Sequence, residues 1–481
     1  MPAVFTPRRI QTALRVGVTM FALSLASCAL KDPPTSSDLK EQSLPNLKLP
    51  ALWTAKGTDG AVEDQWIAAL GDPQLPPLVA EAIANNPDIR VAAARMEQAA
   101  AGVKAAGGQA WPAIDFLART GGKIGGDGSG LGGWVVSASW ELDLWGRVRY
   151  GKRAAEDQYA SAEADAIAAS QSLAALVAKA WFVATEARLQ RQLALEMIAA
   201  SEQLVALARD RDRVGVGSAL DVALAQARLQ GLRDAERQLD LAQQQALRSL
   251  EILLGRYPAA EIQVATSFPT LPMQVPAGVP SQLLERRPDV IAAQRRVDVA
   301  FNLAGQADAA RLPRISLTAG ISSISSDVFV LQERNNPVVG FGANLFAPLF
   351  NAGQLEAQAE ARRAEQKQAA AIWAQVGLRA FNEVESALAS EATLAAREPL
   401  LVAQVAESQK ALSLETDRYR VGSRDLRTVS TQQLEVYSAR TNLLRVQAEQ
   451  RIQRVNLYLA LGGGFGPPAK LAAASTPPPP R

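Results

Sequence analysis

The chain has 481 residues, of which 48% are hydrophobic and only 5% aromatic, and its formal charge at neutral pH is +2. It contains no histidine and a single cysteine, Cys28, which excludes histidine-bearing metal sites, Ser/His/Asp triads and disulfide frameworks. Positive and negative residues are interspersed, which gives no basis for a nucleic-acid surface. No catalytic group stands out, so we expect a protein that is not an enzyme and holds no metal or cofactor.

The N-terminus has the pattern of a secretory signal. Three arginines precede an apolar run at residues 16–26, which is too short to span a bilayer permanently. The run ends in Leu-Ala-Ser-Cys28, which resembles a bacterial lipobox. This resemblance implies that residues 1–27 are removed and that Cys28 is acylated, for example with palmitate; the alternative is a cysteine that merely follows a signal. Ala29 after the cysteine favours the outer membrane by the same resemblance.

The rest of the chain reads as an internal duplication. Asn-Pro87-Asp-Ile recurs as Arg-Pro288-Asp-Val, 201 positions later, whereas Gly215 and Gly422 lie 207 positions apart. The register therefore changes by six residues, and the change falls between residues 313 and 353. Each half is predicted to contain a helix, two strands, a very long helix, a tight turn and a returning helix.

Long helices are expected in both halves. Residues 152–213 contain neither Gly nor Pro and are rich in helix-forming residues, which predicts a rod of about 60 residues and about 90 Å. The second half repeats this rod at 354–421, with interruptions expected at Gly377 and Pro399, and returns at 423–461. Apolar residues three and four positions apart predict coiled-coil seams. The expected seam residues are Leu193, Met197, Ala200, Leu204 and Leu207 before the first turn, and Leu232, Ala235, Leu239, Ala242, Ala246 and Leu253 after it.

Four segments alternate between apolar and small or polar residues, as β-strands do. Such strands fit either a soluble sheet on a core or a transmembrane barrel with a wet interior. Later segments lack 18 uninterrupted apolar residues, so a membrane-spanning chain would have to use these strands. Their connections, 120–133 and 322–337, are expected to be exposed loops. The expected apolar faces are Ile114, Phe116 and Ala118; Trp134, Val136, Ala138, Trp140 and Leu142; Ile315, Leu317, Ala319 and Ile321; and Val339, Phe341, Ala343 and Leu345.

Four strands do not close a barrel alone. A barrel needs about eight or more strands, and an open edge in lipid leaves backbone groups unpaired. Several chains would therefore have to share one barrel. Two, three or four chains would supply eight, twelve or sixteen strands, and strand physics does not choose among them.

Three motifs resemble those of a known family. Residues 284–290 (Leu-Glu-Arg-Arg-Pro-Asp-Val), 141–147 (Glu-Leu-Asp-Leu-Trp-Gly-Arg) and 348–353 (Pro-Leu-Phe-Asn-Ala-Gly) are similar to motifs of the TolC-like outer membrane factors. The specific resemblance is to the NodT/OprM-type lipoproteins of resistance-nodulation-division (RND) efflux systems, over nearly the whole mature chain. It implies a mixed, mainly α fold: a homotrimer whose 12-stranded β-barrel in the outer membrane continues as an α-helical barrel in the periplasm.

The duplication gives the two repeats of the expected domain plan, and the resemblance implies its equatorial segments. Residues 28–77 form an N-terminal anchor and equatorial segment, and residues 78–255 form the first repeat. An equatorial linker, 256–280, leads to the second repeat, 281–462. The Pro- and Gly-rich end, 463–481, is expected to be a disordered tail.

The function that the resemblance implies is passage rather than chemistry. The protein is expected to be the outer membrane channel of a tripartite efflux system for drugs or other small molecules, with a periplasmic adaptor and an inner-membrane RND pump as partners. One alternative is a TolC-like duct for type I protein secretion. Another is a periplasmic coiled-coil adaptor lipoprotein, although adaptors have one helical hairpin and this chain has two in tandem.

The helix turns are the expected adaptor contacts. By the resemblance, they lie at the periplasmic tip, whereas spacing alone indicates only hairpin turns, in which glycine lets the backbone reverse. The tip residues are Arg213, Val214 and Gly215 in the first half and Arg420, Val421 and Gly422 in the second.

The gate is carried over residue by residue. Asp221, Tyr419 and Arg424 match positions that hold the helices of the family's best-known member closed, so a link from Asp221 to Arg424 and Tyr419 is expected. The alternative is that Asp221 caps the returning helix. The chain departs from the family at two gate positions that often carry acids. These are Thr428 and Thr431, with Arg427 nearby, which puts cation binding and selectivity in doubt.

Overall fold

A computed structural model of the chain describes residues 30–55, 57, 60, 62, 65–119, 131–271, 275–326 and 337–464. The expected signal segment, the acylation site Cys28 and residues 465–481 of the expected tail lie outside the described residues. Most of the two expected strand connections, 120–130 and 327–336, lies outside them as well.

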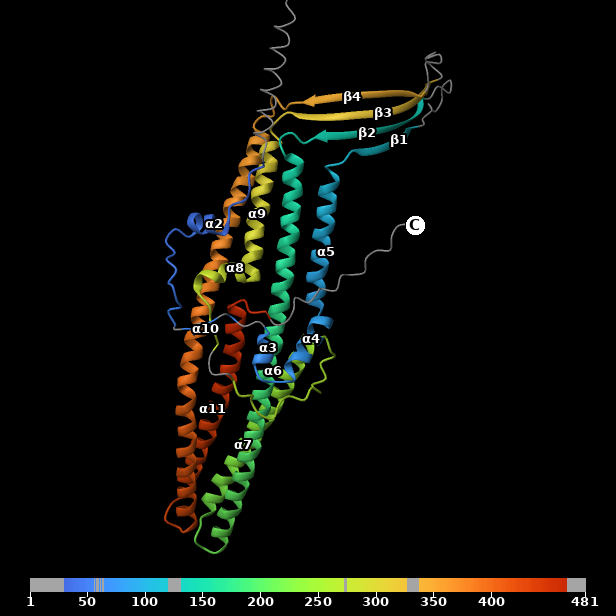
Figure 1. The fold of residues 1–481 in the computed structure, drawn as a ribbon. Coiled ribbons are helices and arrows are strands. Elements are labelled where there is room, and N and C mark those ends of the chain that lie inside the picture. The colour runs from blue at the N-terminus through green and yellow to red at the C-terminus, as the bar shows by residue number, and fades with distance from the viewer. Residues whose placement is uncertain are drawn as a thin grey trace, which may run out of the picture. The chain divides into compact units, whose positions relative to one another are not determined.

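Helices and strands alternate as the duplication predicts (Figure 1). Short helices α2 (Ser36–Ser43) and α3 (Trp66–Ala69) precede the first repeat. That repeat contains α4 (Leu75–Asn85), α5 (Pro87–Gly108), β1 (Ala113–Arg119), β2 (Leu131–Leu142), α6 (Arg147–Arg213) and α7 (Ala219–Leu253). The second contains η1 (Pro280–Gln282), α8 (Leu283–Arg286), α9 (Pro288–Ala309), β3 (Arg314–Ser326), β4 (Val338–Phe346), α10 (Gln354–Arg420) and α11 (Leu426–Ala460).

Corresponding helices in the two halves have equal lengths, which confirms the duplication. Helices α5 and α9 have 22 residues each, α6 and α10 have 67, and α7 and α11 have 35. Equivalent glycines also share left-handed backbone conformations: φ is +76° at Gly215 and +84° at Gly422. The same holds for the pairs Gly146 and Gly353, and Gly255 and Gly462.

Helix α6 is longer than predicted, and α10 has the predicted length but no interruption. Helix α6 begins at Arg147 rather than at residue 152, because the Asp143 carboxylate accepts hydrogen bonds from the backbone N–H groups of Val148 (3.0 Å) and Arg149 (2.9 Å) and so satisfies the first turn. The predicted interruptions of α10 were wrong. The helix continues through Gly377 and Pro399, because a long packed helix tolerates the loss of the one hydrogen bond that proline removes.

The predicted coiled-coil seam is shifted in part. Leu193, Met197 and Leu204 are buried as expected, but Ala200 is exposed and Ser201 is buried in its place. The spacing of three and four is right, but the buried stripe is wider than a two-helix seam because α6 contacts more than one neighbour. In α7 the buried residues are Ala225, Leu229, Leu232, Glu236, Leu247, Leu250 and Glu251. Of the predicted α7 seam, Leu232 is buried, Ala242 is exposed, and Ala235, Leu239, Ala246 and Leu253 are half-buried.

The chain divides into two compact units, and each draws on both sequence halves. The first comprises Met1–Asn46, Arg95–Glu163 and Ala292–Gln375 and contains all four strands; we call it the sheet unit. The second comprises Leu47–Ala94, Ala164–Ile291 and Val376–Arg481 and contains the two helical hairpins; we call it the hairpin unit.

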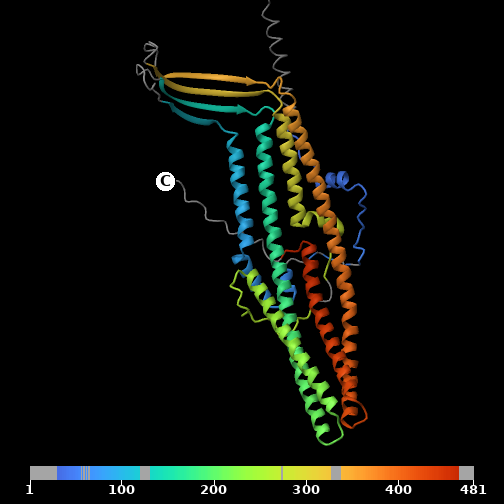
Figure 2. The same cartoon turned by 180° about the vertical axis from the view of Figure 1, so that it is seen from behind.

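In the sheet unit, the four strands form one antiparallel sheet in the order β1-β2-β3-β4 (Figures 1 and 2). The register aligns the predicted apolar residues across all strands. Phe116 pairs with Val136, Val136 with Ile321, and Ile321 with Val339. Small and polar residues form most of the other face, but its row of Leu117, Val135, Ser322 and Val338 is largely apolar, so the predicted polar face is confirmed only in part. Strand β2 starts at Leu131 and β3 ends at Ser326, so both connections are shorter than predicted.

The apolar face of the sheet is exposed in the single chain. Phe341 is 86% exposed, Ile114 74% and Phe116 68%, although such side chains gain free energy from leaving water. A contiguous apolar surface of this kind marks a membrane or protein contact. In a soluble protein, the apolar face of a sheet packs against a hydrophobic core. Here that face is exposed instead.

One described helix is also apolar enough to be tested as a membrane span. Helix α6 contains an 18-residue window of mean hydropathy 1.4, and 50% of that window is buried inside the protein. A core helix of a soluble protein passes the same test, and this window is half buried by its neighbours.

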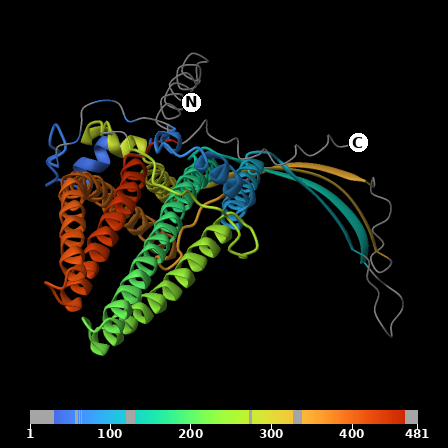
Figure 3. The same cartoon turned by 90° about the horizontal axis from the view of Figure 1, so that it is seen from below.

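In the hairpin unit, α6 with α7 and α10 with α11 form two helical hairpins that lie side by side, as Figure 3 shows from below. A buried cluster near the turns includes Leu204 and Ala208 of α6, Leu229 of α7, Tyr419 of α10 and Val429 of α11. Because this cluster takes residues from all four helices, it holds the ends of the two hairpins together.

The hairpin unit also joins the segments expected to form the equatorial region. The indole N–H of Trp53 donates to the carbonyl of Ala277 (3.0 Å), and the backbone N–H of Gln65 donates to the carbonyl of Gly464 (2.6 Å). Contacts thus link residues before the first repeat, between the repeats and after the second repeat.

Candidate functional site

The two hairpin turns are built alike. Gly215 and Gly422 adopt left-handed backbone conformations, which glycine enters without the strain that a Cβ causes. In the first turn, Ser218 caps α7 by accepting a hydrogen bond from the backbone N–H of Leu220 (3.0 Å). In the second, Asp425 caps α11 by accepting from the backbone N–H of Thr428 (2.9 Å). The alternative that Asp221 caps α7 is wrong, since Ser218 occupies that position.

Each turn exposes apolar side chains. Val421 is 80% exposed and Val214 66%, and Val216 and Leu220 are also largely exposed. Charged side chains surround them, with local ion pairs from Arg213 to Asp210 and, in the equivalent positions, from Arg420 to Asp417. An apolar centre with a charged rim has the composition of a protein-docking surface.

Arg211 connects the two turns, and the sequence analysis did not identify it. Its Nη1 donates to the carbonyl oxygens of Tyr419 (2.7 Å) and Arg420 (3.2 Å) at the end of α10. Its Nη2 donates to the carbonyl of Val216 (3.0 Å) in its own turn, and its guanidinium lies 4.7 Å from the centroid of the Tyr419 ring. A cation at these carbonyls also complements the negative end of the α10 dipole. Arg211 is one of several arginines near the turn, so no sequence signal distinguishes it.

The predicted gate residues are only partly brought together. Within one chain, Arg424 pairs with Glu415 of α10 (3.5 Å) instead of Asp221. The Tyr419 side chain is buried, and its hydroxyl has no hydrogen-bond partner among the described residues. Burial raises the pKa of Tyr419 and the charge of Asp221 adds to the rise, whereas Arg211 opposes it. The Asp221 carboxylate therefore acts on Tyr419 electrostatically without bonding to it.

The two threonines at the gate bond within their own helix. The Thr428 hydroxyl donates to the Asp425 carboxylate (2.7 Å), and the Thr431 hydroxyl donates to the carbonyl of Arg427 (3.0 Å). Neither residue brings a negative charge to this part of α11.

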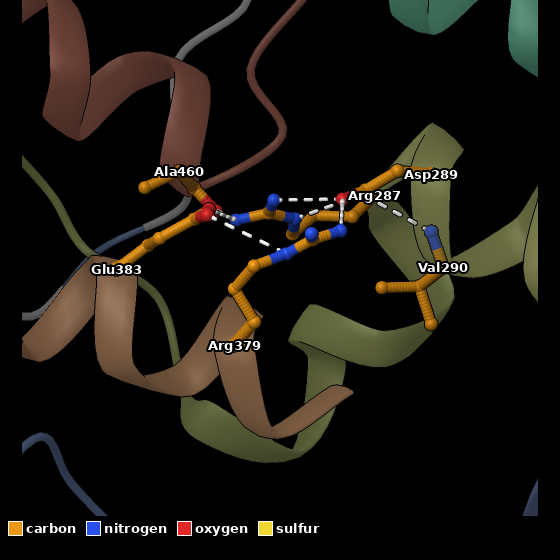
Figure 4. Close-up of polar contacts among 6 residues, drawn as sticks. All are labelled: Arg287, Asp289, Val290, Arg379, Glu383 and Ala460. Carbon is orange, nitrogen blue, oxygen red and sulfur yellow. Dashed lines mark hydrogen bonds and ion pairs between the residues drawn. The ribbon is translucent and has the colours of Figure 1, made fainter. Parts of the chain in front are cut away.

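Arg287 anchors the start of the second repeat (Figure 4). Its Nε and Nη2 donate to the two carboxylate oxygens of Asp289 (3.0 and 2.9 Å), and its Nη1 pairs with Glu383 of α10 (2.7 Å). Nη1 also donates to the carbonyl of Ala460 (3.1 Å) at the end of α11. Arg379 reaches the same carboxylates from α10 at 3.8 Å (Glu383) and 4.0 Å (Asp289).

The charges of this network stabilise one another. Burial alone would lower the pKa of Arg287, but its hydrogen bonds to Asp289 and the charges of Asp289 and Glu383 outweigh that effect and raise it. Burial alone would raise the pKa of Asp289, but the hydrogen bonds and charge of Arg287 lower it. The network thus favours both ionised forms and ties α9, α10 and α11 together.

The first repeat makes the equivalent contact with a neutral side chain. Asn86, which also precedes a proline, donates its Nδ2 to the carbonyl of Leu253 (3.0 Å) at the end of α7. Asn86 and Arg287 are 201 positions apart, and Leu253 and Ala460 are 207 apart, so each pair keeps the register of the duplication. Both repeats therefore fix the returning helix to the start of the repeat by the same capping contact.

This combination defines a class of protein: a TolC-like outer membrane channel, with tandem helical hairpins and a sheet whose apolar face is exposed. The described residues contain no group of three or more acidic or cysteine side chains that could hold a metal ion. The chain matches the outer membrane efflux protein family over residues 78–256 and 279–463 and belongs to that family.

Relatives and solved structures agree. The chain is 30% identical to the pyoverdine export outer membrane protein OpmQ of Pseudomonas aeruginosa, over 92% of this chain and 95% of that protein. It is 28% identical to the cation efflux system protein CusC of Escherichia coli K12, over 92% and 98% respectively. Its fold is similar to the open state of the MtrE outer membrane channel of Neisseria gonorrhoeae, with a TM-score of 0.77 and 25% identity over 91% of this chain and 98% of that one. The outer-membrane channel OprN gives a TM-score of 0.79 at 28% identity, over 88% and 99%. The protein is accordingly an efflux channel of the outer membrane.

Proposed function

We propose that three copies of this chain form one export duct, in which twelve strands, four from each chain, close a single β-barrel. The sheet carries the proposal, because its apolar face is exposed and strands β1 and β4 are open edges. Unpaired backbone groups at these edges would cost several kcal/mol each in lipid, and pairing β1 of one chain with β4 of the next satisfies them. The choice of three copies rests on the family resemblance, since edge pairing alone fits other numbers.

Two further roles are assigned to the N-terminal cysteine and to the hairpin unit. We assign lipid attachment to Cys28 on the basis of its lipobox-like sequence. The hairpin unit extends the barrel as a helical conduit in the periplasm. Transport through such a conduit needs no bond to be made or broken, so no residue is assigned a catalytic role.

The tips of the two hairpins are the proposed contact with a periplasmic adaptor, which links the duct to an inner-membrane RND pump. The residues assigned to this contact surround Gly215 and Gly422. Exposed Val214 and Val421 supply the apolar surface, and Arg213 and Arg420 supply charge at its rim. The helical hairpins of an adaptor present the kind of amphipathic surface that this composition fits.

The proposed gate has two parts. Arg211 holds the two hairpin turns of one chain together through the carbonyls at the end of α10. Asp221 and Arg424 form a second link in the assembled trimer, where Arg424 exchanges Glu415 for Asp221. Tyr419 lies under Arg211 and close enough to Asp221 to sense its charge, so it belongs to both parts. Arg427, Thr428 and Thr431 line the aperture without an acidic ring.

Small organic molecules are the proposed cargo. The names of the two relatives given above refer to pyoverdine and to cations. Membership of the family therefore does not determine the class of cargo. Thr428 and Thr431 offer neutral hydroxyls that already bond within α11, and Arg427 adds a positive charge that repels cations. These three positions therefore offer no carboxylate to metal ions, which supports small organic compounds as the cargo.

Drug susceptibility tests this function. The gene is expressed with its own adaptor and pump in a host that lacks outer membrane efflux channels, and minimum inhibitory concentrations of several drug classes are measured. Restored resistance, with loss of resistance when the pump is omitted, is expected. If only export of a protein substrate is restored, the type I secretion alternative is right. If neither is restored with the full set of partners, the proposed function is wrong.

A further inference from the structure

Helices α6 and α9 pack closely in the sheet unit, apart from the proposed gate and tips. Gly305 of α9 lies against the Tyr150 ring of α6, where a Cβ would come within 2.8 Å of Cε1. The Ser161 hydroxyl of α6 donates to the carbonyl of Ala292 of α9 (3.3 Å). Asp298 and Asn302 of α9 are buried in this contact.

Two aspartates face each other in this contact. Asp157 comes from α6 and Asp298 from α9, and a single arginine, Arg295, approaches both carboxylates, at 3.8 and 3.4 Å. The Nδ2 of Asn302 donates to the Asp157 carboxylate (2.8 Å). Asp298 is only 4% exposed and Asn302 1%. One partly exposed positive charge thus serves two carboxylates, of which Asp298 is the buried one.

Two oxygen atoms in this site are left without a donor. Asp298 Oδ1 and Asn302 Oδ1 are buried and have no hydrogen-bond partner in the described part of the chain. The two residues are four positions apart on α9, so their side chains lie on one face of the helix. Both atoms are acceptors and so do not bond to each other, and leaving each unsatisfied is unfavourable.

We propose that Asp298 is a proton-binding site: its Oδ1 takes up a proton from solvent and donates it in a hydrogen bond to Asn302 Oδ1. A proton converts one orphan acceptor into a donor and satisfies both atoms at once. It also leaves one carboxylate, Asp157, opposite one guanidinium, Arg295, so the buried charges balance. A metal ion is a poorer occupant because Arg295 already holds a positive charge at the same carboxylates.

The electrostatic surroundings agree with this geometry. Burial raises the pKa of Asp298 to about 6, with Asp157 adding to the rise and Arg295 opposing it. Burial also raises the pKa of Asp157, and the charge of Glu156 adds to the rise. Arg295, Arg153 and the hydrogen bond from Asn302 oppose it. The folded protein therefore binds this proton more tightly than the unfolded chain, in which an aspartate titrates near 3.8. The contribution of this proton to the stability of the folded state is fully present below about pH 4. It is lost as the pH rises through about 6.

Proton binding would affect the two helices that connect directly to the central strands of the sheet. Helix α6 follows β2 and helix α9 precedes β3, and these two strands are neighbours in the sheet. Mild acid would thus tighten the helix pair that carries the two central strands, and neutral pH would loosen it.

Infrared difference spectroscopy gives the direct test. Purified full-length protein in detergent is compared with Asp298→Asn, and the carbonyl stretch of a protonated carboxyl is measured across pH 4 to 8. A band that is present at pH 5, disappears with a midpoint near 6 and is missing in Asp298→Asn is expected. Asp308→Asn on the same helix, whose carboxylate pairs with Arg363 and Arg311, should keep the band.

Denaturation midpoints supply a second readout. Asp298→Asn should be more stable than the wild type at pH 7.5, and the difference should shrink toward pH 5. The asparagine amide can donate to Asn302 Oδ1 as the protonated acid does. A carboxyl band whose midpoint is near 4, or an Asp298→Asn variant that is less stable at every pH, would overturn the proposal. A midpoint that moves with sodium or magnesium concentration at fixed pH would assign the site to a metal ion and would also overturn it.

Discussion

Arg211 of α6 lies 4.7 Å from the centroid of the Tyr419 ring of α10 and donates a 2.7 Å hydrogen bond to the carbonyl of Tyr419. This contact joins the turn of one hairpin to the end of the other. The long helices could slide or splay without such a contact, since the apolar cluster beneath it is not directional. Arg211 is therefore a directional polar contact between the two turns.

Replacing Arg211 with alanine should open the duct. Charge-assisted hydrogen bonds of this kind are worth about 1.5–3 kcal/mol, so their loss shifts a closed–open equilibrium about tenfold or more toward open. Single-channel conductance and susceptibility to large antibiotics should both rise. Arg209→Ala, an exposed arginine on the same helix, is the control and should change neither. Arg211→Lys should be intermediate, because one ammonium does not reach three carbonyls as a guanidinium does.

The inter-chain link is tested by a double substitution, Asp221→Ala with Arg424→Ser. If Arg424 leaves Glu415 for Asp221 in the trimer, conductance should rise, and the increase should add to that of Arg211→Ala. The link is worth about 0.2–1 kcal/mol if it is solvated, so a smaller rise than for Arg211→Ala is expected. Unchanged conductance would remove the link and leave Arg211 as the gate contact.

Leucine in place of Gly215 should abolish efflux while trimers remain intact. The backbone there has φ of +76°, and a Cβ costs roughly 1–2 kcal/mol in that conformation, so the turn must rearrange. No heavy atom lies within 4 Å of the position of a Cβ, so the rest of the hairpin has room. Gly231→Leu, at an equally open position inside α7, is the control. Drug resistance that survives Gly215→Leu would argue against docking at the tip.

Arginine in place of Phe341 should prevent stable insertion in the membrane. Phe341 is 86% exposed on the apolar face, and an arginine on a lipid face costs about 2–4 kcal/mol near the bilayer midplane. Gly340→Arg is the matched control, because the neighbouring residue of the strand points to the polar face. Heat-resistant trimers on a gel should be lost in the first variant and kept in the second. The reverse pattern would mean that the faces have been assigned to the wrong environments.

Arg287→Ala should destabilise the hairpin unit by about 1–3 kcal/mol, because it removes hydrogen bonds to the partly exposed carboxylates of Asp289 and Glu383 and to the carbonyl of Ala460. Arg379→Ala, whose side chain is 60% exposed, should cost less than about 1 kcal/mol. Denaturation midpoints measure both. The Asp289 contribution has a defined pH dependence: its pKa is lowered in the folded state, so the stabilisation is present above about 4 and is lost as pH falls through the folded value.

The sequence determined most of the fold because its signals are periodic and occur twice. The alternation in the strands predicted which side chains share a face, and the constant offsets predicted equal helices in the two halves. Helix ends were less predictable, because Asp143 extends α6 by a side-chain cap that periodicity does not contain. The predicted interruption of α10 at Pro399 was wrong. The rule that proline interrupts a helix is derived from isolated helices, and packing along a long helix can outweigh it.

The candidate site was only partly predictable. Glycine marked both turns, because the backbone needs left-handed residues there. Arg211 was missed because its partners are backbone carbonyls of another hairpin, and a carbonyl leaves no mark in the sequence. The pairing of Arg424 with Glu415 was not predicted for a related reason. Several acidic residues lie near the turn in the sequence, and only the geometry of the helices determines which of them pairs with Arg424.

We propose that identical chains combine their sheets to make one hole through lipid. The most direct measurement is planar-bilayer recording of the purified, detergent-solubilised protein, with native mass measurement of the same sample. We expect a mass of three chains and discrete conductance steps that increase in Arg211→Ala. A water-soluble monomer that never conducts would contradict this proposal.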